Sequence, residues 1–257
     1  MSLQRFSGRS AIVTGSTLGI GYAIAKRLAE EGAKVIISSR NKKNVEDAVK
    51  KLKQQDLDVK GVVCHVNDSE NRKQLLQEAE GKLDILVCSA GVNPAFGPLF
   101  QCSEPAWDKT FEVNVKASFL LTKEALPLLR RSKAGRVIYH STASVFHHLE
   151  NLGTYAVSKA ALCTLTKYAA YELGPGNITV NCIAPGYIKT RFSEKLAEYG
   201  REEGPSLPVI PLRRQVWGRY QVDLVGSPED VSGLVAFLVS DEAAYITGEN
   251  IVISGGK

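Results

Sequence analysis

The sequence predicts an α/β fold, a doubly wound parallel sheet of about seven strands with helices on both faces. Short apolar runs rich in β-branched residues alternate with longer amphipathic segments along the chain, which indicates repeated strand-helix-strand units. The runs lack polar alternation, as is typical of strands covered on both sides. The 257 residues are 44% hydrophobic and 23% charged, which favours one domain over residues 1–257 without disulfide or metal staples.

Seven apolar runs are the expected strands: residues 10–14, 34–38, 60–65, 83–88, 136–140, 179–183 and 250–253. The segments between them, such as the one that ends at Gly32, are the expected helices. Ligands of such a fold bind at the carboxyl ends of the strands. Residues 193–227 contain three of the prolines and are too long for an ordinary connection, so we expect a substrate lid there.

Charge and cysteine usage exclude several classes of protein. The net charge of +5 is spread along the chain without a basic block, which argues against a nucleic-acid partner. The five cysteines show no C-x-x-C spacing, which indicates a reducing compartment and no zinc site. The first residues lack a signal-peptide pattern, and no apolar run is long enough to span a bilayer. We expect an intracellular protein, cytoplasmic, with the peroxisome or mitochondrion as alternatives.

A glycine-rich turn, TGSTLGIG at residues 14–21, joins the first expected strand to an amphipathic helix. Glycine lets the backbone turn sharply and approach a pyrophosphate, and the helix N-terminus presents free N–H groups. The spacing differs from G-x-G-x-x-G, but its position between strand and helix predicts a dinucleotide site of the Rossmann type. The expected cofactor contacts in this turn are Gly15, Ser16, Thr17, Gly19, Ile20 and Gly21.

The end of the second expected strand indicates which dinucleotide binds. An NAD site usually places an acidic residue there to hold the ribose 2′-hydroxyl. This chain has Ser39 followed by Arg40, so no carboxylate repels a 2′-phosphate and a guanidinium can bind it. We expect NADPH/NADP as the cofactor, with both residues in contact with it.

Tyr155 and Lys159 are four residues apart at the start of an expected helix, so they share one helix face. A nearby ammonium should lower the phenol pKa from about 10, and the lysine could also hold the nicotinamide ribose. The preceding strand ends in His-Ser-Thr-Ala-Ser at residues 140–144. A hydroxyl there could donate to a substrate carbonyl, and Ser141, Thr142 and Ser144 remain alternatives.

The glycine pattern, Tyr155 with Lys159, Asn114 within FEVNV and Pro185-Gly186 occur in the order found in short-chain dehydrogenases/reductases. From about Gly8 to Gly256 the chain resembles this family. The resemblance implies that Asn114 binds a water linking Lys159 to solvent, and that the protein is a homotetramer. It also implies cofactor contacts at Val66, Ala90, Gly91, Pro185, Gly186, Ile188 and Thr190.

Three segments, VNPAFG at 92–97, WDK at 107–109 and IKT at 188–190, resemble one branch of the family. Its members are NADPH-dependent carbonyl reductases acting on retinal and on aromatic or α-dicarbonyl compounds. The expected function is therefore reduction of a small ketone, aldehyde or α-dicarbonyl to an alcohol, with Tyr155 as proton donor. The alternatives are an NADP-linked alcohol, steroid or retinol dehydrogenase working oxidatively, and a catalytically silent nucleotide-binding scaffold.

The chain departs from the family pattern in three places. The usual Asn-Asn-Ala-Gly is Cys-Ser-Ala-Gly at residues 88–91, which removes an amide that ties neighbouring strands. Counting back from Tyr155, the catalytic serine position holds Thr142, and a one-residue shift would give the role to Ser141. Residues 213–224 look inserted. His147 and His148 lack a further ligand cluster, so no metal is predicted.

Overall fold

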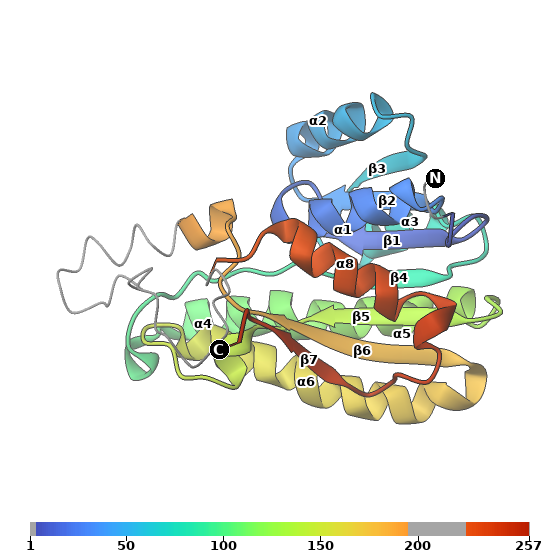
Figure 1. Ribbon diagram of the computed structural model, residues 1–257. Helices are drawn as coiled ribbons and strands as arrows, with labels where there is room; N and C mark the ends of the chain where they lie inside the picture. The colour runs from blue at the N-terminus through green and yellow to red at the C-terminus, as the bar shows by residue number, and fades with distance from the viewer. Residues whose placement is uncertain (1–3, 195–224, 257) are drawn as a thin grey trace.

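The computed structural model describes residues 4–194 and 225–256, and within them seven strands form one parallel sheet in the order β3-β2-β1-β4-β5-β6-β7 (Figure 1). The strands are β1 Ser10–Thr14, β2 Lys34–Ser39, β3 Val59–Val63, β4 Ile85–Cys88, β5 Gly135–His140, β6 Ile178–Pro185 and β7 Asn250–Ile253. The predicted doubly wound parallel fold is confirmed. The strand bounds differ from those predicted by at most two residues.

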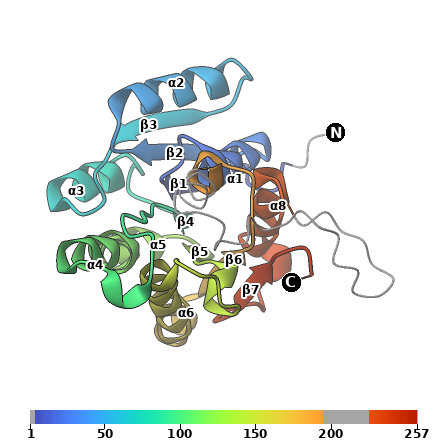
Figure 2. The same ribbon diagram turned by 90° about the vertical axis from the view of Figure 1, so that its left-hand side faces the viewer.

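Helices cover both faces of the sheet (Figure 2). They are α1 Gly19–Glu30, α2 Lys42–Lys53, α3 Ser69–Gln77, α4 Glu104–Phe111, α5 Ala117–Leu129, α6 Gly153–Leu173 and α8 Pro228–Leu238. Helices α1 and α8 pack together on one face, and α3, α5 and α6 lie on the other. A π-helical turn, η2 Glu112–Lys116, connects α4 to α5.

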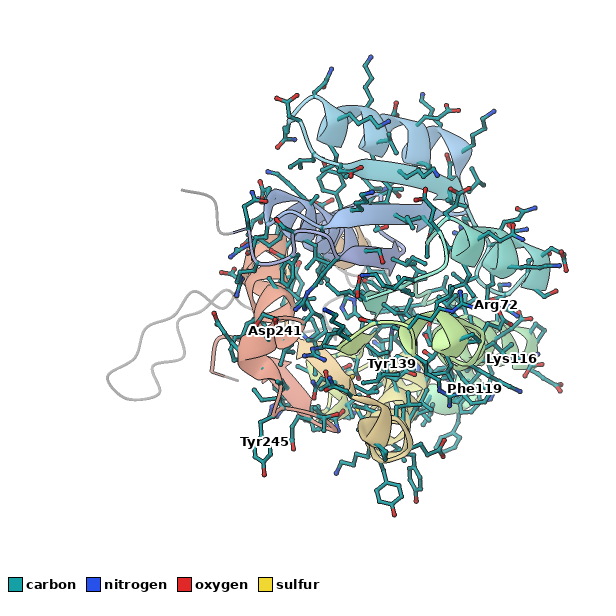
Figure 3. The ribbon with its side chains drawn as sticks, turned by 90° about the vertical axis from the view of Figure 1, so that its right-hand side faces the viewer. Arg72, Lys116, Phe119, Tyr139, Asp241 and Tyr245 are labelled. Carbon is teal, nitrogen blue, oxygen red and sulfur yellow. The ribbon has the colours of Figure 1, made fainter. Side chains whose placement is uncertain are left out.

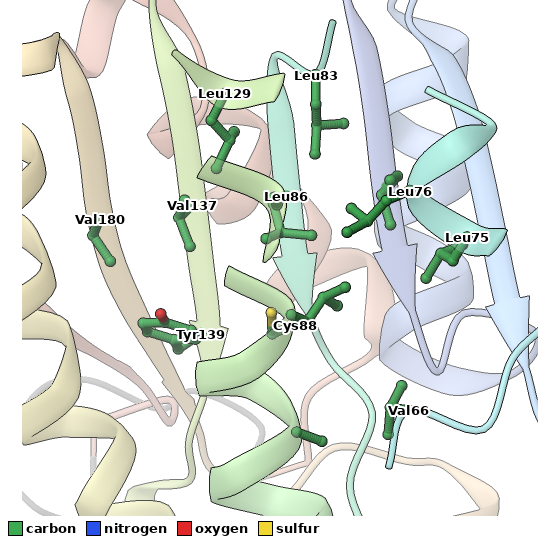
Figure 4. Packing of buried hydrophobic residues seen from close by; sticks show 14 of the residues in the cluster. Val66, Leu75, Leu76, Leu83, Leu86, Cys88, Leu129, Val137, Tyr139 and Val180 are labelled. Atoms are coloured by element: carbon green, nitrogen blue, oxygen red, sulfur yellow. The ribbon is translucent and has the colours of Figure 1, made fainter. Parts of the chain in front are cut away.

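The side chains of successive strand residues pack into two separate hydrophobic cores, one on each face of the sheet. In β1, Ala11 and Val13 belong to the cluster with α1 and α8, whereas Ile12 belongs to the cluster with α3, α5 and α6. Figure 4 shows the second cluster, in which Leu86 and Tyr139 pack beneath α5. Every residue of β4 and β6 is buried. Burial on both sides explains why these runs lack polar alternation.

A partly buried ion pair links α3 to α5 on one face of the sheet. Arg72 of α3 donates from Nε and Nη2 to the Glu124 carboxylate at 2.9 and 2.8 Å, and from Nη1 to the Val66 carbonyl at 2.9 Å (Figure 3). The same guanidinium therefore fixes α3 against α5 and the loop that leaves β3. Because Arg72 is 3% exposed, removing one partner would leave a buried charge unpaired.

Because all seven strands run parallel, the loops after them gather at one edge of the sheet. The predicted lid at about 193–227, with the insertion at 213–224, falls almost entirely on residues 195–224, which lie outside the described residues. Within the described residues, none of the helices combines the length and apolar character that crossing a membrane requires.

Candidate functional site

The glycine turn brings the loops after β1 and β4 into backbone contact. Gly15 has φ +62°, and a Cβ there would lie 2.8 Å from the Cα of Ala90. A Cβ on Gly21 would meet the Gly15 carbonyl oxygen. Both positions therefore require glycine, and the turn can fold tightly against the start of α1.

The N-terminus of α1 opens toward the strand ends. Gly19 begins the helix with φ +58°, and the N-cap residue Leu18 forms no side-chain hydrogen bond to the first turn. The methyl of Thr190 lies 3.3 Å from the position of a Gly19 Cβ, so the loop after β6 borders the same turn. Uncapped N–H groups and the helix dipole favour an anion here, and the turn fits the diphosphate of a dinucleotide.

Ser16 and Thr17, which were also predicted to bind the cofactor, are buried. The Ser16 hydroxyl donates to the Val13 carbonyl and accepts from the backbone N–H of Ser38 at 3.0 Å. This hydroxyl therefore holds the turn against β2. A cofactor contact from either residue stays a prediction.

The end of β2 presents an unpaired cation. Arg40 is exposed, and among the described residues its guanidinium forms neither an ion pair nor a hydrogen bond. Ser39 beside it is half-buried. A free guanidinium at this strand end fits a ribose 2′-phosphate.

Asn114 lies in the π-helical turn and is fully buried. Its Oδ1 accepts from the Val92 N–H at 2.8 Å, and its Nδ2 donates to the Val92 carbonyl and to Ser158 Oγ, both at 3.0 Å. One amide thus joins the loop after β4, the π-helical turn and α6. Such turns are frequent at functional sites. The water predicted at Asn114 stays a prediction.

Lys159 is buried, with 2% of its surface exposed, and its Nζ donates to the His140 carbonyl at 2.7 Å. A Cβ on Gly91 would lie 3.2 Å from that Nζ and 3.3 Å from Asn114 Oδ1, so a side chain here would crowd both groups. Burial lowers the pKa of Lys159 to about 8. Lys159, Gly91 and Asn114, all predicted site residues, therefore converge at the ends of β4 and β5.

Tyr155 is half-buried, and its hydroxyl has no hydrogen-bond partner among the described residues. The sequence predicted that Lys159 lowers the pKa of Tyr155. This prediction is wrong for the chain alone, because burial raises that pKa. The Lys159 Nζ lies 5.7 Å from the centre of the phenol ring and bonds to His140 instead. The ring of Phe192, which the sequence did not single out, lies 5.6 Å from that of Tyr155, tilted by 40°.

The structure separates the three alternative hydroxyls. Ser141 is buried and donates to the Lys159 carbonyl at 2.9 Å, so its proton is committed to α6. Thr142 is half-buried and accepts from the N–H of Ser144 at 3.3 Å and from its hydroxyl at 3.1 Å. Only Thr142, among these three, keeps an uncommitted hydroxyl proton.

A contact that the sequence did not predict links the loop after β4 to the last residue of β5. Ser89 Oγ and His140 Nδ1 are 2.7 Å apart, and Thr14 Oγ1 accepts from the N–H groups of Ser89 and Ala90 at 3.2 Å each. Burial, with a smaller effect of Lys159, lowers the pKa of His140 to about 3, so its ring is neutral at physiological pH. The contact between Ser89 and His140 thus ties these neighbouring strands together, as an amide of the usual Asn-Asn-Ala-Gly would.

The remaining predicted contacts lie around the same edge. Gly186 donates its N–H to the Ile253 carbonyl at 2.9 Å, directly after the buried Pro185. Ile188 is buried and pairs with Gly226 in an isolated bridge. Val66 is buried in the cluster that Ala90 packs against. Among the described residues no group of three or more His, Cys, Asp or Glu side chains could hold a metal ion.

Comparison with known proteins agrees with this geometry. Residues 15–257 match the family model described as Enoyl-(Acyl carrier protein) reductase. The chain is 46% identical to Dehydrogenase/reductase SDR family member 4 of Sus scrofa, over 96% of this chain and 86% of that protein. It is 45% identical to Dehydrogenase/reductase SDR family member 2, mitochondrial, of Homo sapiens, over 97% of this chain and 86% of that protein.

A solved structure supports the same assignment. The short-chain type dehydrogenase/reductase from Mycobacterium ulcerans superposes with a TM-score of 0.86 at 28% identity, over 98% of this chain and 90% of that one. Members of this family are oxidoreductases that use NAD(P) and bind small-molecule substrates. The resemblance predicted from the sequence is confirmed: the chain belongs to the short-chain dehydrogenase/reductase family.

Proposed function

We propose that this protein reduces a ketone, aldehyde or α-dicarbonyl to an alcohol with NADPH. The observation that carries the proposal is that Tyr155 in α6 and Thr142 shortly after β5 each keep a hydroxyl proton with no acceptor among the described residues, with the buried ammonium of Lys159 5.7 Å from the centre of the Tyr155 ring. Burial raises the pKa of Tyr155, so the phenol keeps its proton at neutral pH. Reduction requires a protonated donor, and a phenol that keeps its proton meets this requirement.

The preference for NADPH is supported by Arg40, which has no partner among the described residues. The neighbouring position 39 holds a serine and so places no carboxylate beside it. The glycine turn and the N-terminus of α1 would hold the diphosphate, and Gly91 with Lys159 would hold the nicotinamide ribose. Bound NADPH supplies a hydride for the carbonyl carbon.

The chain's own groups then handle the oxygen of the substrate. Thr142 Oγ1 donates a hydrogen bond that polarises the carbonyl, and Tyr155 Oη transfers its proton as negative charge develops on that oxygen. Asn114 holds the loop after β4 against α6, which keeps Lys159 next to Gly91.

The homotetramer is also a proposal. Apolar side chains on the face of α4, η2 and α5 are exposed to solvent, among them Trp107 at 36% and Phe119 at 48% (Figure 3). A reducing compartment such as the cytoplasm is supported by the cysteines, all five of which are free thiols. We further propose that residues 1–257 form one domain.

The test follows NADPH absorbance with purified protein and isatin, diacetyl or retinal, in parallel with NADH, and NADP⁺ with a panel of alcohols. We expect carbonyl reduction that is much faster with NADPH. Alcohol oxidation with no carbonyl reduction would identify an oxidative dehydrogenase. Tight NADPH binding without turnover of any compound would identify a silent scaffold.

A further inference from the structure

Ser144 directs both of its hydrogen-bond donors at a single atom. It lies in the short turn η3, Ala143–Val145, that follows β5. Its hydroxyl donates to Thr142 Oγ1 at 3.1 Å, and its backbone N–H donates to the same oxygen at 3.3 Å. Ser144 is 7% exposed, so a substrate has little access to it.

These two bonds determine what the Thr142 hydroxyl can do. A hydroxyl has two acceptor lone pairs and one proton to donate, and Ser144 occupies both lone pairs. Among the described residues nothing accepts the proton of Thr142, whose side chain is half-buried at the strand end. The proton is therefore directed away from Ser144 and is available to a ligand.

The neighbouring serine provides the contrast. Ser141 is 1% exposed, donates to the Lys159 carbonyl at 2.9 Å and accepts from the Cys163 thiol at 3.3 Å. Its proton is therefore committed to holding the chain after β5 to α6. Of the three hydroxyls, that of Ser141 donates to α6, that of Thr142 has a proton available to a ligand, and that of Ser144 donates to Thr142.

We propose that Ser144 is a positioning residue for carbonyl reduction, acting through Thr142. It sets the rotation of the Thr142 hydroxyl so that its proton faces the substrate oxygen. Hydrogen bonds in a chain polarise one another, so the bond from Ser144 also makes Thr142 a stronger donor to the charge that develops there. The inference rests on the proposed function, because it concerns the same reaction and the same oxygen.

The test is a double-mutant cycle with Ser144→Ala, Thr142→Val and the double variant, using isatin and NADPH. Loss of one oriented hydrogen bond should lower kcat about tenfold in Ser144→Ala, with the NADPH dissociation constant unchanged. In the Thr142→Val background, Ser144→Ala should change kcat by less than about twofold, because the two residues act as a unit. The matched control is Ser232→Ala, which removes another buried serine hydroxyl, on α8.

Several results would overturn the proposal. Wild-type kcat in Ser144→Ala, or an equal fall in the Thr142→Val background, would show that Ser144 does not act through Thr142. If Ser144→Ala fails to fold, Ser144→Cys keeps the volume with a weak donor and should show the same loss of kcat. If the enzyme reduces isatin and needs Tyr155 but gives either of these results, this inference alone is wrong. An enzyme that reduces no carbonyl would sink the proposed function as well.

Discussion

Replacing Arg40 with Ala separates binding of the 2′-phosphate from binding of the rest of the dinucleotide. The guanidinium is exposed and forms no ion pair or hydrogen bond among the described residues, so its removal breaks neither kind of bond in that part of the chain. We therefore expect the urea midpoint of unfolding to stay at the wild-type value. Any effect on a ligand then reports a contact with that ligand.

The size of the effect follows from the kind of bond. A hydrogen bond to a charged group contributes about 1.5–3 kcal/mol, and the exposed position of Arg40 places it in the lower half of that range. A loss of about 1.5–2 kcal/mol weakens binding roughly 10- to 30-fold. NADPH should lose this affinity, whereas NADH, which lacks the phosphate, should change by less than about twofold.

Isothermal titration of wild type and Arg40→Ala with both dinucleotides measures the difference directly. Lys43→Ala is the matched control, because it removes one exposed positive charge three positions along the chain. Raising the salt concentration should reduce the gap between the two proteins for NADPH, since an exposed ion pair is screened. Equal losses for NADPH and NADH, or no loss for either, would refute a phosphate contact at Arg40.

Three further predictions test the frame of the site. Gly21→Ala should lower the free energy of unfolding by about 1–3 kcal/mol, because its Cβ would press on the Gly15 carbonyl. The control is Gly174→Ala, at a position with open space around it. Equal urea curves for the two variants would contradict the prediction. Ser89→Ala should lower the free energy of unfolding by about 1 kcal/mol by breaking the bond to His140, and an unchanged urea midpoint would show that the bond contributes nothing. In the folded chain burial lowers the pKa of Lys159 to about 8 from 10.5, so between these values the unfolded chain holds the proton and the folded chain does not. The free energy of unfolding should therefore rise with pH over this window relative to Lys159→Met, and a flat or falling difference would count against it.

Local patterns in the sequence predicted the sheet and the glycine turn. The predicted strands 10–14 and 250–253 match β1 and β7, because short runs rich in β-branched apolar residues favour strands. Gly15, Gly19 and Gly21 were predictable because their positions demand backbone freedom or close approach, which the sequence displays directly. Asn114 and Gly91 were placed by resemblance, and the fold brings both to Lys159.

Contacts between distant residues could not be predicted in the same way. Ser89 and His140 are 51 positions apart and meet only because β4 pairs with β5 in one register. The direction of the Tyr155 pKa shift depends on burial of the phenol in the folded chain, and the Lys159 ammonium donates to the His140 carbonyl. The choice of Thr142 over Ser141 likewise depends on which hydroxyl α6 has already engaged.

The central claim is that the Tyr155 hydroxyl delivers the proton in carbonyl reduction. Stopped-flow measurement of Tyr155→Phe with NADPH and isatin tests it most directly, because the substitution removes only an oxygen that has no hydrogen-bond partner in residues 4–194 and 225–256. We predict NADPH binding within about twofold of wild type and a fall in turnover of about 100- to 10,000-fold. Wild-type turnover in Tyr155→Phe would contradict the account.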